Sequence, residues 1–172
     1  MSMLVVGMGD GKVTGNREDV LTTYALGSCI AVMAHDASAG VGGLLHLMLP
    51  DSKLDVAKAA ARPWMFADSG LRELLAAVQR LGANRKTTSV WLAGGAKVLA
   101  NADVFSIGKR NYQAVRKLLW QEGLIVRGEE VGGTQSRTVR LDVATGQTWI
   151  KTCNTNASGT MNDGGLQWRL MC

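Results

Sequence analysis

One threonine, one cysteine and one histidine lie within 24 residues of one another: Thr23, Cys29 and His46. A thiol that attacks a carbonyl carbon needs a base to accept its proton, and the base needs a partner that fixes its orientation. These residue types could fill the three roles. Gly27 and Ser28 stand directly before the cysteine, and the glycine would allow a close backbone approach beside a nucleophile. This pattern indicates a cysteine hydrolase or a cysteine transferase.

The elements that must position these side chains form a predicted β-hairpin. Two apolar runs, 30–35 and 41–48, are separated by a short loop of small residues. If the loop is centred between Ala37 and Ser38, Cys29 lies directly opposite His46. Opposed residues in an antiparallel pair have Cβ atoms roughly 4.5–5.5 Å apart on the same face. His35 lies six residues along the strand from Cys29, about 20 Å at roughly 3.4 Å per residue, so His46 is the predicted base.

The remaining pattern predicts a mixed chain of helices and strands. Helical spacing of apolar residues covers 55–81 and 108–123. Apolar or alternating runs predict further strands at 3–8, 19–26, 89–93, 124–131, 136–143 and 147–153. The segment from Gly7 to Lys12 is interpreted as a turn. Gly94 and Gly95 end one predicted strand, where they could admit a substrate backbone or simply turn the chain.

Composition narrows the class of protein. The 172 residues suffice for one domain with a substantial core. The net charge of +5 suits an acidic partner surface, whereas no Lys/Arg cluster is interleaved with aromatic residues as nucleic-acid binding requires. Three cysteines without a CxxC pair fit a reducing cytoplasm. No run approaches 18 apolar residues, so we expect a soluble, cytoplasmic protein without membrane insertion.

Two further features bear on function. The predicted helix at 108–123 carries four bases on its outer face, Lys109, Arg110, Arg116 and Lys117, which could steer an acidic partner or simply be solvated. A metal site is poorly supported, because one cysteine and one histidine lack a third ligand at a usual spacing. Cys153 and Cys172 have no base nearby in the sequence and are predicted to be non-catalytic.

The order of these motifs resembles the CheD family of bacterial chemoreceptor glutamine deamidases. The resemblance covers residues 1–152, the predicted single deamidase domain, and leaves 153–172 as a C-terminal tail that we expect to be irregular except for a short terminal strand. The motifs that carry it are Thr23, LGSC at 26–29, HLMLPDS at 46–52, AGGA at 93–96, IGKRN at 107–111, GG at 132–133, Arg137 and ATG at 144–146.

The resemblance implies an α+β fold of packed, sandwich-like β-sheets with about two main helices outside. It also implies that Cys29, His46 and Thr23 catalyse the hydrolysis of a glutamine carboxamide through a thioester, with Gly27, Ser28, Gly94 and Gly95 near the site. The substrate would be the cytoplasmic domain of a chemoreceptor, the partner a CheC-type response-regulator phosphatase, and no cofactor is implied. Because the thiolate is the reactive form, we expect an imidazolium to lower the pKa of Cys29.

Two other functions use the same residues differently. A regulatory binding module could keep the fold and the surface for a CheC-type phosphatase while doing little catalysis, although such a module has no need of a complete Thr23, Cys29 and His46 set. A transglutaminase-like acyl transferase would form the same thioester and resolve it with an amine in place of water. The reaction product separates these alternatives.

Overall fold

Two five-stranded β-sheets form the body of the protein. The computed structural model describes residues 2–97, 102–153 and 167–171. Sheet A has, in spatial order, the strands β1 (Ser2–Val5), β3 (Asp19–Leu26), β8 (Ser136–Asp142), β9 (Thr148–Cys153) and β10 (Arg169–Leu170). Sheet B has the strands β2 (Asp10–Thr14), β5 (Val41–Leu47), β4 (Ile30–Asp36), β6 (Thr88–Gly94) and β7 (Ile125–Val131).

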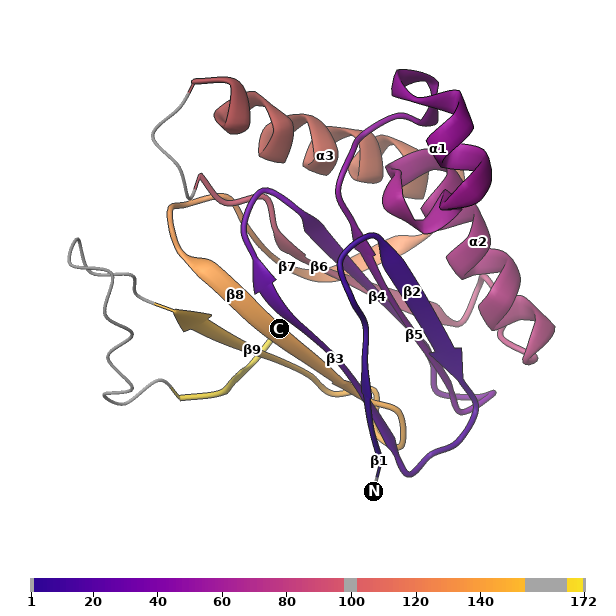
Figure 1. The fold of residues 1–172 in the computed structure, drawn as a ribbon. Coiled ribbons are helices and arrows are strands. Elements are labelled where there is room, and N and C mark those ends of the chain that lie inside the picture. The colour runs from indigo at the N-terminus through magenta and orange to yellow at the C-terminus, as the bar shows by residue number, and fades with distance from the viewer. Residues whose placement is uncertain (1, 98–101, 154–166, 172) are drawn as a thin grey trace.

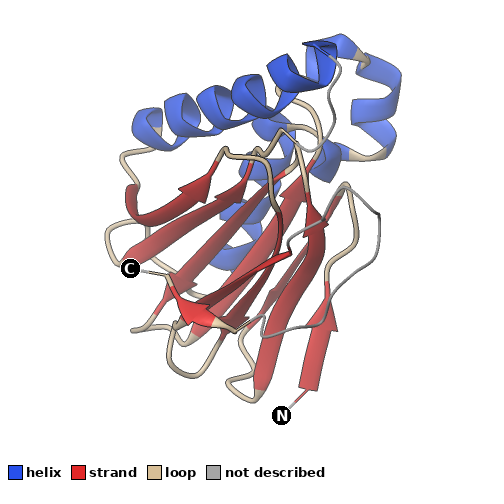
Figure 2. Cartoon of the chain, turned by 90° about the vertical axis from the view of Figure 1, so that its left-hand side faces the viewer, coloured by secondary structure: helices blue, strands red, loops and turns tan. Residues whose placement is uncertain are grey.

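The helices lie on the side of sheet B that faces away from sheet A (Figure 1). They are the short α1 (Val56–Ala61) and the longer α2 (Ala67–Arg80) and α3 (Ala102–Gln121), with 3-10 turns at Ser52–Leu54 and Pro63–Met65. Seen from the side, the strands are layered beneath the helices (Figure 2). The predicted α+β fold with packed sheets and two main helices outside is therefore confirmed. No helix within the described ranges is long and apolar enough to cross a membrane.

The central strands of sheet B, β4 and β5, are buried on both faces, and most of their residues are apolar. Successive side chains of a strand point to opposite faces. Ile30 and Val32 of β4 accordingly join the core beneath the helices. Ala31 and Met33 join a second core between the two sheets. The same alternation in β5 sends Leu45 towards the helices and leaves His46 on the inter-sheet face.

The loop of the predicted hairpin is centred one residue later than expected, so the register derived from the sequence is wrong. Asp36 pairs with Val41, so the loop comprises the four residues 37–40, and Ala31 lies opposite His46. The Asp36 carboxylate accepts hydrogen bonds from the backbone N–H groups of Ser38 and Ala39, which stabilises this four-residue turn. The error is two residues, and a two-residue shift keeps every side chain on its face. Cys29 and His46 thus share a face as neighbours on a diagonal.

Other sequence predictions need correction at particular elements. The supposed turn at 7–12 runs into strand β2, which pairs with β5 and places Asp10 opposite His46. The helical stretch 55–81 is divided, because Pro63 begins a 3-10 turn and α2 starts only at Ala67. The predicted strand near the C-terminus is present as β10. The predicted irregular segment at 154–166 lies outside the described residues.

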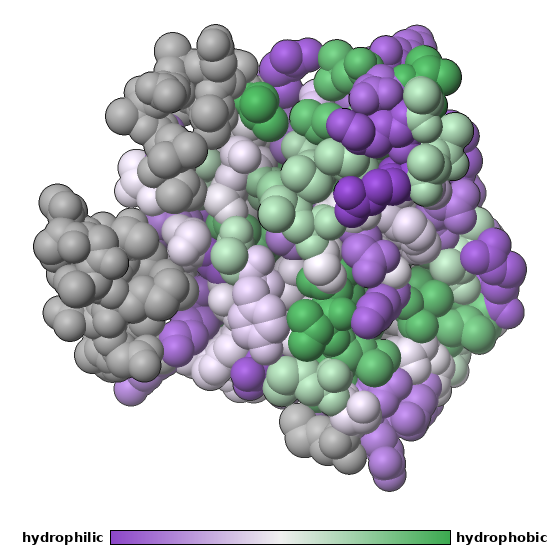
Figure 3. All heavy atoms as spheres, in the orientation of Figure 1, coloured by the Kyte–Doolittle hydropathy of each residue, from purple (hydrophilic) through white to green (hydrophobic). Residues whose placement is uncertain are grey.

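The outer face of sheet A carries apolar side chains in contact with solvent. Met3 and Val5 of β1 are 45% and 46% exposed, and Tyr24 of β3 is 44% exposed. In the space-filling view, apolar and polar residues are interspersed over the face of the molecule that is turned to the viewer (Figure 3). The helices thus cover sheet B alone.

Candidate active site

Thr23 points into the space between the sheets, as Leu21 does two residues earlier, and a β-bulge after Thr23 returns Leu26 to the same face. Thr23 pairs with Val139 of β8 and Leu26 with Arg137, so three steps along β3 match two along β8. Without the extra residue, Thr23 and Leu26 would point to opposite faces of the sheet. Both are buried, at 1% and 0% exposure. Ala25 accommodates the bulge with a φ of 55°, in the left-handed region.

The hydroxyl of Thr23 fixes the tautomer of His46. Thr23 Oγ1 lies 2.7 Å from the carbonyl oxygen of Val6 and 2.7 Å from His46 Nδ1. The hydroxyl has a single proton, and it is donated to the carbonyl of Val6, which can only accept. His46 Nδ1 must therefore carry a proton and donate it to Thr23 Oγ1. The other ring nitrogen, Nε2, is then left with a free lone pair.

This arrangement makes His46 a base. Its side chain is 3% exposed, and Nε2 is buried without a hydrogen-bond partner among the described residues. An unsatisfied buried acceptor is destabilising, so its presence calls for a functional explanation. Here it lies on the inter-sheet face of sheet B, the face that Cys29 also adjoins. The geometry suits proton transfer from a thiol at Cys29 to His46 Nε2.

Cys29 lies at the end of the turn between β3 and β4, where three successive carbonyl groups are held. We call residues 27–29 the nucleophile turn. The carbonyl of Gly27 accepts from Ala96 N at 2.8 Å, and the carbonyl of Cys29 accepts from Gly95 N at 2.8 Å. The carbonyl of Ser28 accepts from the Asn111 side chain at 3.1 Å. The turn is thereby fixed in one conformation.

Gly94 and Gly95 are placed beside the nucleophile turn, as the sequence led us to expect. Both have positive φ, 112° and 63°. A Cβ atom at Gly94 would lie 2.1 Å from the carbonyl oxygen of Cys29, which explains why a side chain is not accommodated there. The backbone that approaches these glycines is the chain's own. This contact is neither of the two interpretations left open by the sequence, and a role of these glycines in admitting a substrate backbone stays a prediction.

Burial sets the charge state of the site. It raises the pKa of the Cys29 thiol above 9.0, and the residue's own backbone N–H acts in the opposite direction. Burial also lowers the pKa of His46 to about 4. Both groups are therefore neutral near pH 7. The expected lowering of the pKa of Cys29 by an imidazolium is wrong, because an enclosed site disfavours both charges.

Two buried polar side chains near the nucleophile turn were given no role by the sequence. Asn111 of α3 is fully buried and donates to the carbonyls of Ser28 and Met48. Arg137 of β8 is 7% exposed, and its Nη1 lies 3.2 Å from the carbonyl of Gln135 and 3.5 Å from that of Gly94. For Asn111 a signal was present, since a polar residue four positions before Val115 interrupts the apolar stripe of α3.

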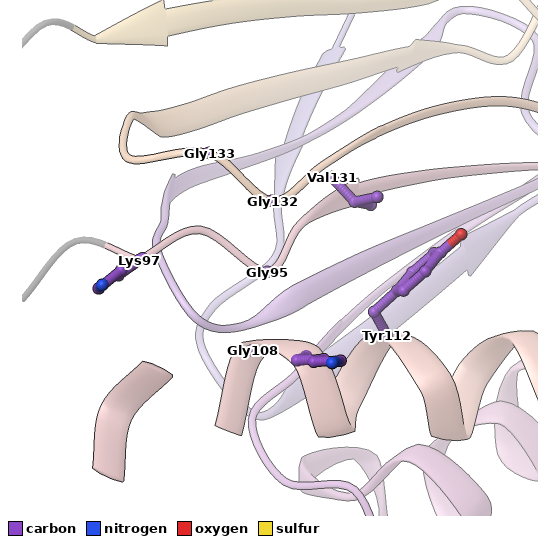
Figure 4. A pocket seen from close by; sticks show the side chains of 8 residues that line it. Gly95, Lys97, Gly108, Tyr112, Val131, Gly132 and Gly133 are labelled. Atoms are coloured by element: carbon purple, nitrogen blue, oxygen red, sulfur yellow. The ribbon is translucent and has the colours of Figure 1, made fainter. Parts of the chain in front are cut away.

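A cavity of about 360 Å³ lies between the nucleophile turn's supporting glycines and α3. It is lined by Gly95, Gly108, Tyr112, Val131, Gly132 and Gly133, with Lys97 and Lys109 completing the wall. Figure 4 shows the ring of Tyr112 rising from α3 and Lys97 on the strand side. Thr23, Cys29 and His46 do not line it. The cavity therefore adjoins the site without containing the catalytic groups.

Comparison with known proteins gives a consistent result. A family model described as "CheD chemotactic sensory transduction" matches residues 48–152. A relative from Solibacter usitatus, named "Probable chemoreceptor glutamine deamidase CheD", is 48% identical over 88% of this chain and 89% of its own length. The corresponding figures for a "Probable chemoreceptor glutamine deamidase CheD 1" from Syntrophus aciditrophicus are 46%, 88% and 94%.

A more distant relative has the same name. The protein from Pyrococcus abyssi, also named "Probable chemoreceptor glutamine deamidase CheD", is 38% identical over 83% of this chain and 86% of its own length. The span matched by the family model begins after His46. The assignment of Thr23, Cys29 and His46 to catalysis therefore depends on their geometry.

Proposed function

Because the chain belongs to the CheD family, we propose that it is a protein-glutamine deamidase that converts glutamines of chemoreceptors to glutamate through a Cys29 thioester. The observation that carries the proposal is the hydrogen-bond chain from Val6 through Thr23 to His46. It leaves a buried imidazole with its unprotonated nitrogen on the face that Cys29 adjoins. The names of the relatives supply the substrate class.

The first half-reaction forms the thioester. Cys29 Sγ attacks the carboxamide carbon while its proton passes to His46 Nε2, and the carbonyl oxygen becomes an oxyanion. The backbone N–H of Cys29 is a donor for this oxygen, because it lies close enough to Sγ to affect the pKa of the thiol. The tetrahedral intermediate then collapses, and the His46 proton leaves with the nitrogen as ammonia.

The second half-reaction hydrolyses the thioester and leaves a glutamate residue in the receptor. A water molecule gives a proton to His46 Nε2 and attacks the thioester carbon, and the C–S bond then breaks. The sulfur takes the proton back from the imidazolium, which restores the neutral pair that burial favours. Thr23 accepts from His46 Nδ1 throughout, so its hydroxyl stabilises the imidazolium and keeps the ring oriented. The net reaction consumes one water and releases one ammonia.

The protein substrate and a second partner follow from the family. Because its substrate would be the cytoplasmic domain of a chemoreceptor, the protein would act in the cytoplasm. The family resemblance also points to a CheC-type response-regulator phosphatase that docks over the Cys29 site. The exposed bases of α3, Lys109, Arg110, Arg116 and Lys117, are placed to attract an acidic surface on either partner.

The test is product analysis on a receptor cytoplasmic domain. Incubation with the protein should release ammonia and raise the mass of particular receptor peptides by the difference between an amide and a carboxyl group. Cys29→Ala protein is the control and should release no ammonia. A parallel incubation with a primary amine distinguishes the acyl transferase, which would attach the amine at the same glutamines. Receptor binding without any change in receptor mass would support the binding module instead.

A further inference from the structure

The side-chain amide of Asn111 joins α3 to the nucleophile turn and to Met48, the residue that directly follows the strand of His46. Its Nδ2 donates to the carbonyl of Ser28 at 3.1 Å and to the carbonyl of Met48 at 2.9 Å. We propose that Asn111 is a positioning residue for the reaction, which aims the backbone N–H of Cys29 at the oxyanion by holding the carbonyl of Ser28. The inference rests on the proposed deamidase function.

The reasoning begins with the planarity of the peptide group. Ser28 C=O and Cys29 N–H belong to one peptide unit, and in a trans peptide they point in opposite directions. No cis peptide occurs in the described residues. A donor in α3 that fixes the direction of the Ser28 carbonyl therefore fixes the Cys29 N–H on the opposite side. That N–H lies beside the Cys29 sulfur, whose pKa it affects, and so beside the reacting carbon of a bound glutamine.

The side chain of Asn111 supplies one of the three hydrogen bonds that hold the carbonyls of the nucleophile turn, and backbone N–H groups supply the other two. The carbonyls of Gly27 and Cys29 are held by the backbone N–H groups of Ala96 and Gly95. The middle carbonyl, that of Ser28, accepts from Asn111. A substitution at 111 therefore releases one peptide unit of the nucleophile turn, and the carbonyl of Met48 with it, while leaving the hydrogen bonds of Gly27 and Cys29 intact. The same substitution leaves β5 between β2 and β4, so His46 keeps its place in the sheet.

The choice of asparagine at this buried position is costly for stability. Asn111 is 0% exposed, and its Oδ1 has no hydrogen-bond partner among the described residues. Leaving a buried acceptor unpaired is destabilising. In return, one neutral –NH₂ group supplies two donors, which no hydroxyl can do. The second bond, to Met48, holds this amide in the orientation that the first requires.

The helix itself is held close to the turn. A Cβ atom at Gly108, one helical turn before Asn111, would lie 2.9 Å from the carbonyl oxygen of Gly95. Figure 4 shows Gly108 on α3 directly below Gly95. Such a tight backbone contact leaves little freedom for α3 to shift relative to the glycines. The backbone of α3 therefore holds Asn111 at a fixed position relative to the nucleophile turn.

The test compares two reactions of Cys29. Deamidation builds charge on a carbonyl oxygen, whereas alkylation by iodoacetamide displaces iodide and builds none. The variant Asn111→Leu keeps the approximate size and removes both donors. We expect its kcat for ammonia release to fall about 10- to 100-fold with KM within about twofold, because removing an oxyanion donor outright costs about 10²- to 10³-fold. The rate of Cys29 alkylation should change far less than kcat, because the backbone N–H is the smaller of the two influences on the pKa of the thiol.

A matched control and a second variant guard against a general loss of structure. Thr88→Val removes a buried hydrogen bond of similar length, 2.8 Å to the carbonyl of Asn84, at the opposite end of β6 from Gly94. It should leave kcat unchanged. In Asn111→Asp the carboxyl group faces the same two carbonyls and can donate only when protonated. Its kcat should therefore rise as the pH falls from 8 to 5, an interval in which the wild-type rate should stay nearly level because His46 titrates near pH 4.

The outcomes separate this inference from the proposed function. If Asn111→Leu retains the wild-type kcat, or if alkylation and deamidation fall in the same proportion, Asn111 does not aim an oxyanion donor. An Asn111→Asp rate that does not rise towards acid pH would also overturn the inference. Failure of the wild-type protein to deamidate any receptor would instead overturn the proposed function, and the alkylation rates would still be measurable.

Discussion

Replacing Thr23 by valine tests how the base is held. The change preserves the shape of the side chain and removes one hydroxyl, which accepts from His46 Nδ1 and donates to the carbonyl of Val6, both at 2.7 Å. Each buried group left unpaired costs about 1–3 kcal/mol. Two groups lose their partner, so we expect the free energy of unfolding to fall by about 2–6 kcal/mol, measured by urea denaturation.

The catalytic effect follows from the same lost bond. Without Thr23 Oγ1 the imidazole loses its orientation, its tautomer preference and its support when it becomes charged. If about 1.4–2.8 kcal/mol of transition-state stabilisation is lost, kcat falls about 10- to 100-fold. KM should change little, because Thr23 acts through His46. Ammonia release from a receptor cytoplasmic domain, measured over a range of receptor concentrations, separates the two constants.

The neighbouring residue provides the control. Thr22 is also fully buried, and its hydroxyl donates to the carbonyl of Val139 at 2.9 Å, away from His46. Thr22→Val should lower stability by about 0.5–1.5 kcal/mol and leave kcat near wild type. Thr23→Ser should retain most activity, since it keeps the hydroxyl. A folded Thr23→Val protein with wild-type kcat, or an equal loss of kcat in Thr22→Val, would refute the assignment of Thr23.

Three further perturbations give distinct expected results. The acid limb of kcat/KM should fall near pH 4, well below the ordinary imidazole pKa of about 6.5. Stability should decline as the pH falls from about 6.5 to about 4, because His46 in the unfolded chain takes up its proton first. An acid limb near 6.5 would contradict a buried base. Gly94→Ala should lose both stability and activity, since its Cβ would lie 2.1 Å from the Cys29 carbonyl, whereas Gly82→Ala, with a φ of 100° and open space around it, should lose only some stability. Inhibition of deamidation by a CheC-type phosphatase should weaken as the receptor concentration rises, because the two compete for one site. It should also weaken as salt screens the basic face of α3. Inhibition independent of receptor concentration would exclude a shared site.

The strands and the shared face of Cys29 and His46 could be predicted from the sequence because they depend on local pattern. Asp19–Leu26 has the predicted bounds, and β4 and β5 differ from prediction by one residue each. The hairpin register could not be predicted, because it depends on how Asp36 stabilises a four-residue loop. Strand β2 was missed since its Gly-Asp-Gly start has the composition of a turn, while its pairing with β5 is a long-range contact.

The sequence predicted which residues form the site better than it predicted their orientation and charge states. The sequence places Thr23 near His46 only if β3 packs against sheet B, and it gives no sign of the bulge after Thr23 that returns Leu26 to the same face. The charge state depends on burial by two sheets at once, so the expected thiolate was wrong. Asn111 lies 82 residues after Cys29, and only the folded chain brings its amide to Ser28.

The central claim is that Cys29 forms a covalent acyl intermediate with a receptor glutamine. The most direct measurement is mass spectrometry of peptides after acid quenching of a single turnover with a receptor cytoplasmic domain. We predict a thioester that joins Cys29 to a receptor glutamine residue with loss of ammonia, and no such adduct in the Cys29→Ala protein. An adduct at Cys153 or Cys172, or receptor deamidation by Cys29→Ala protein at the wild-type rate, would contradict the mechanism.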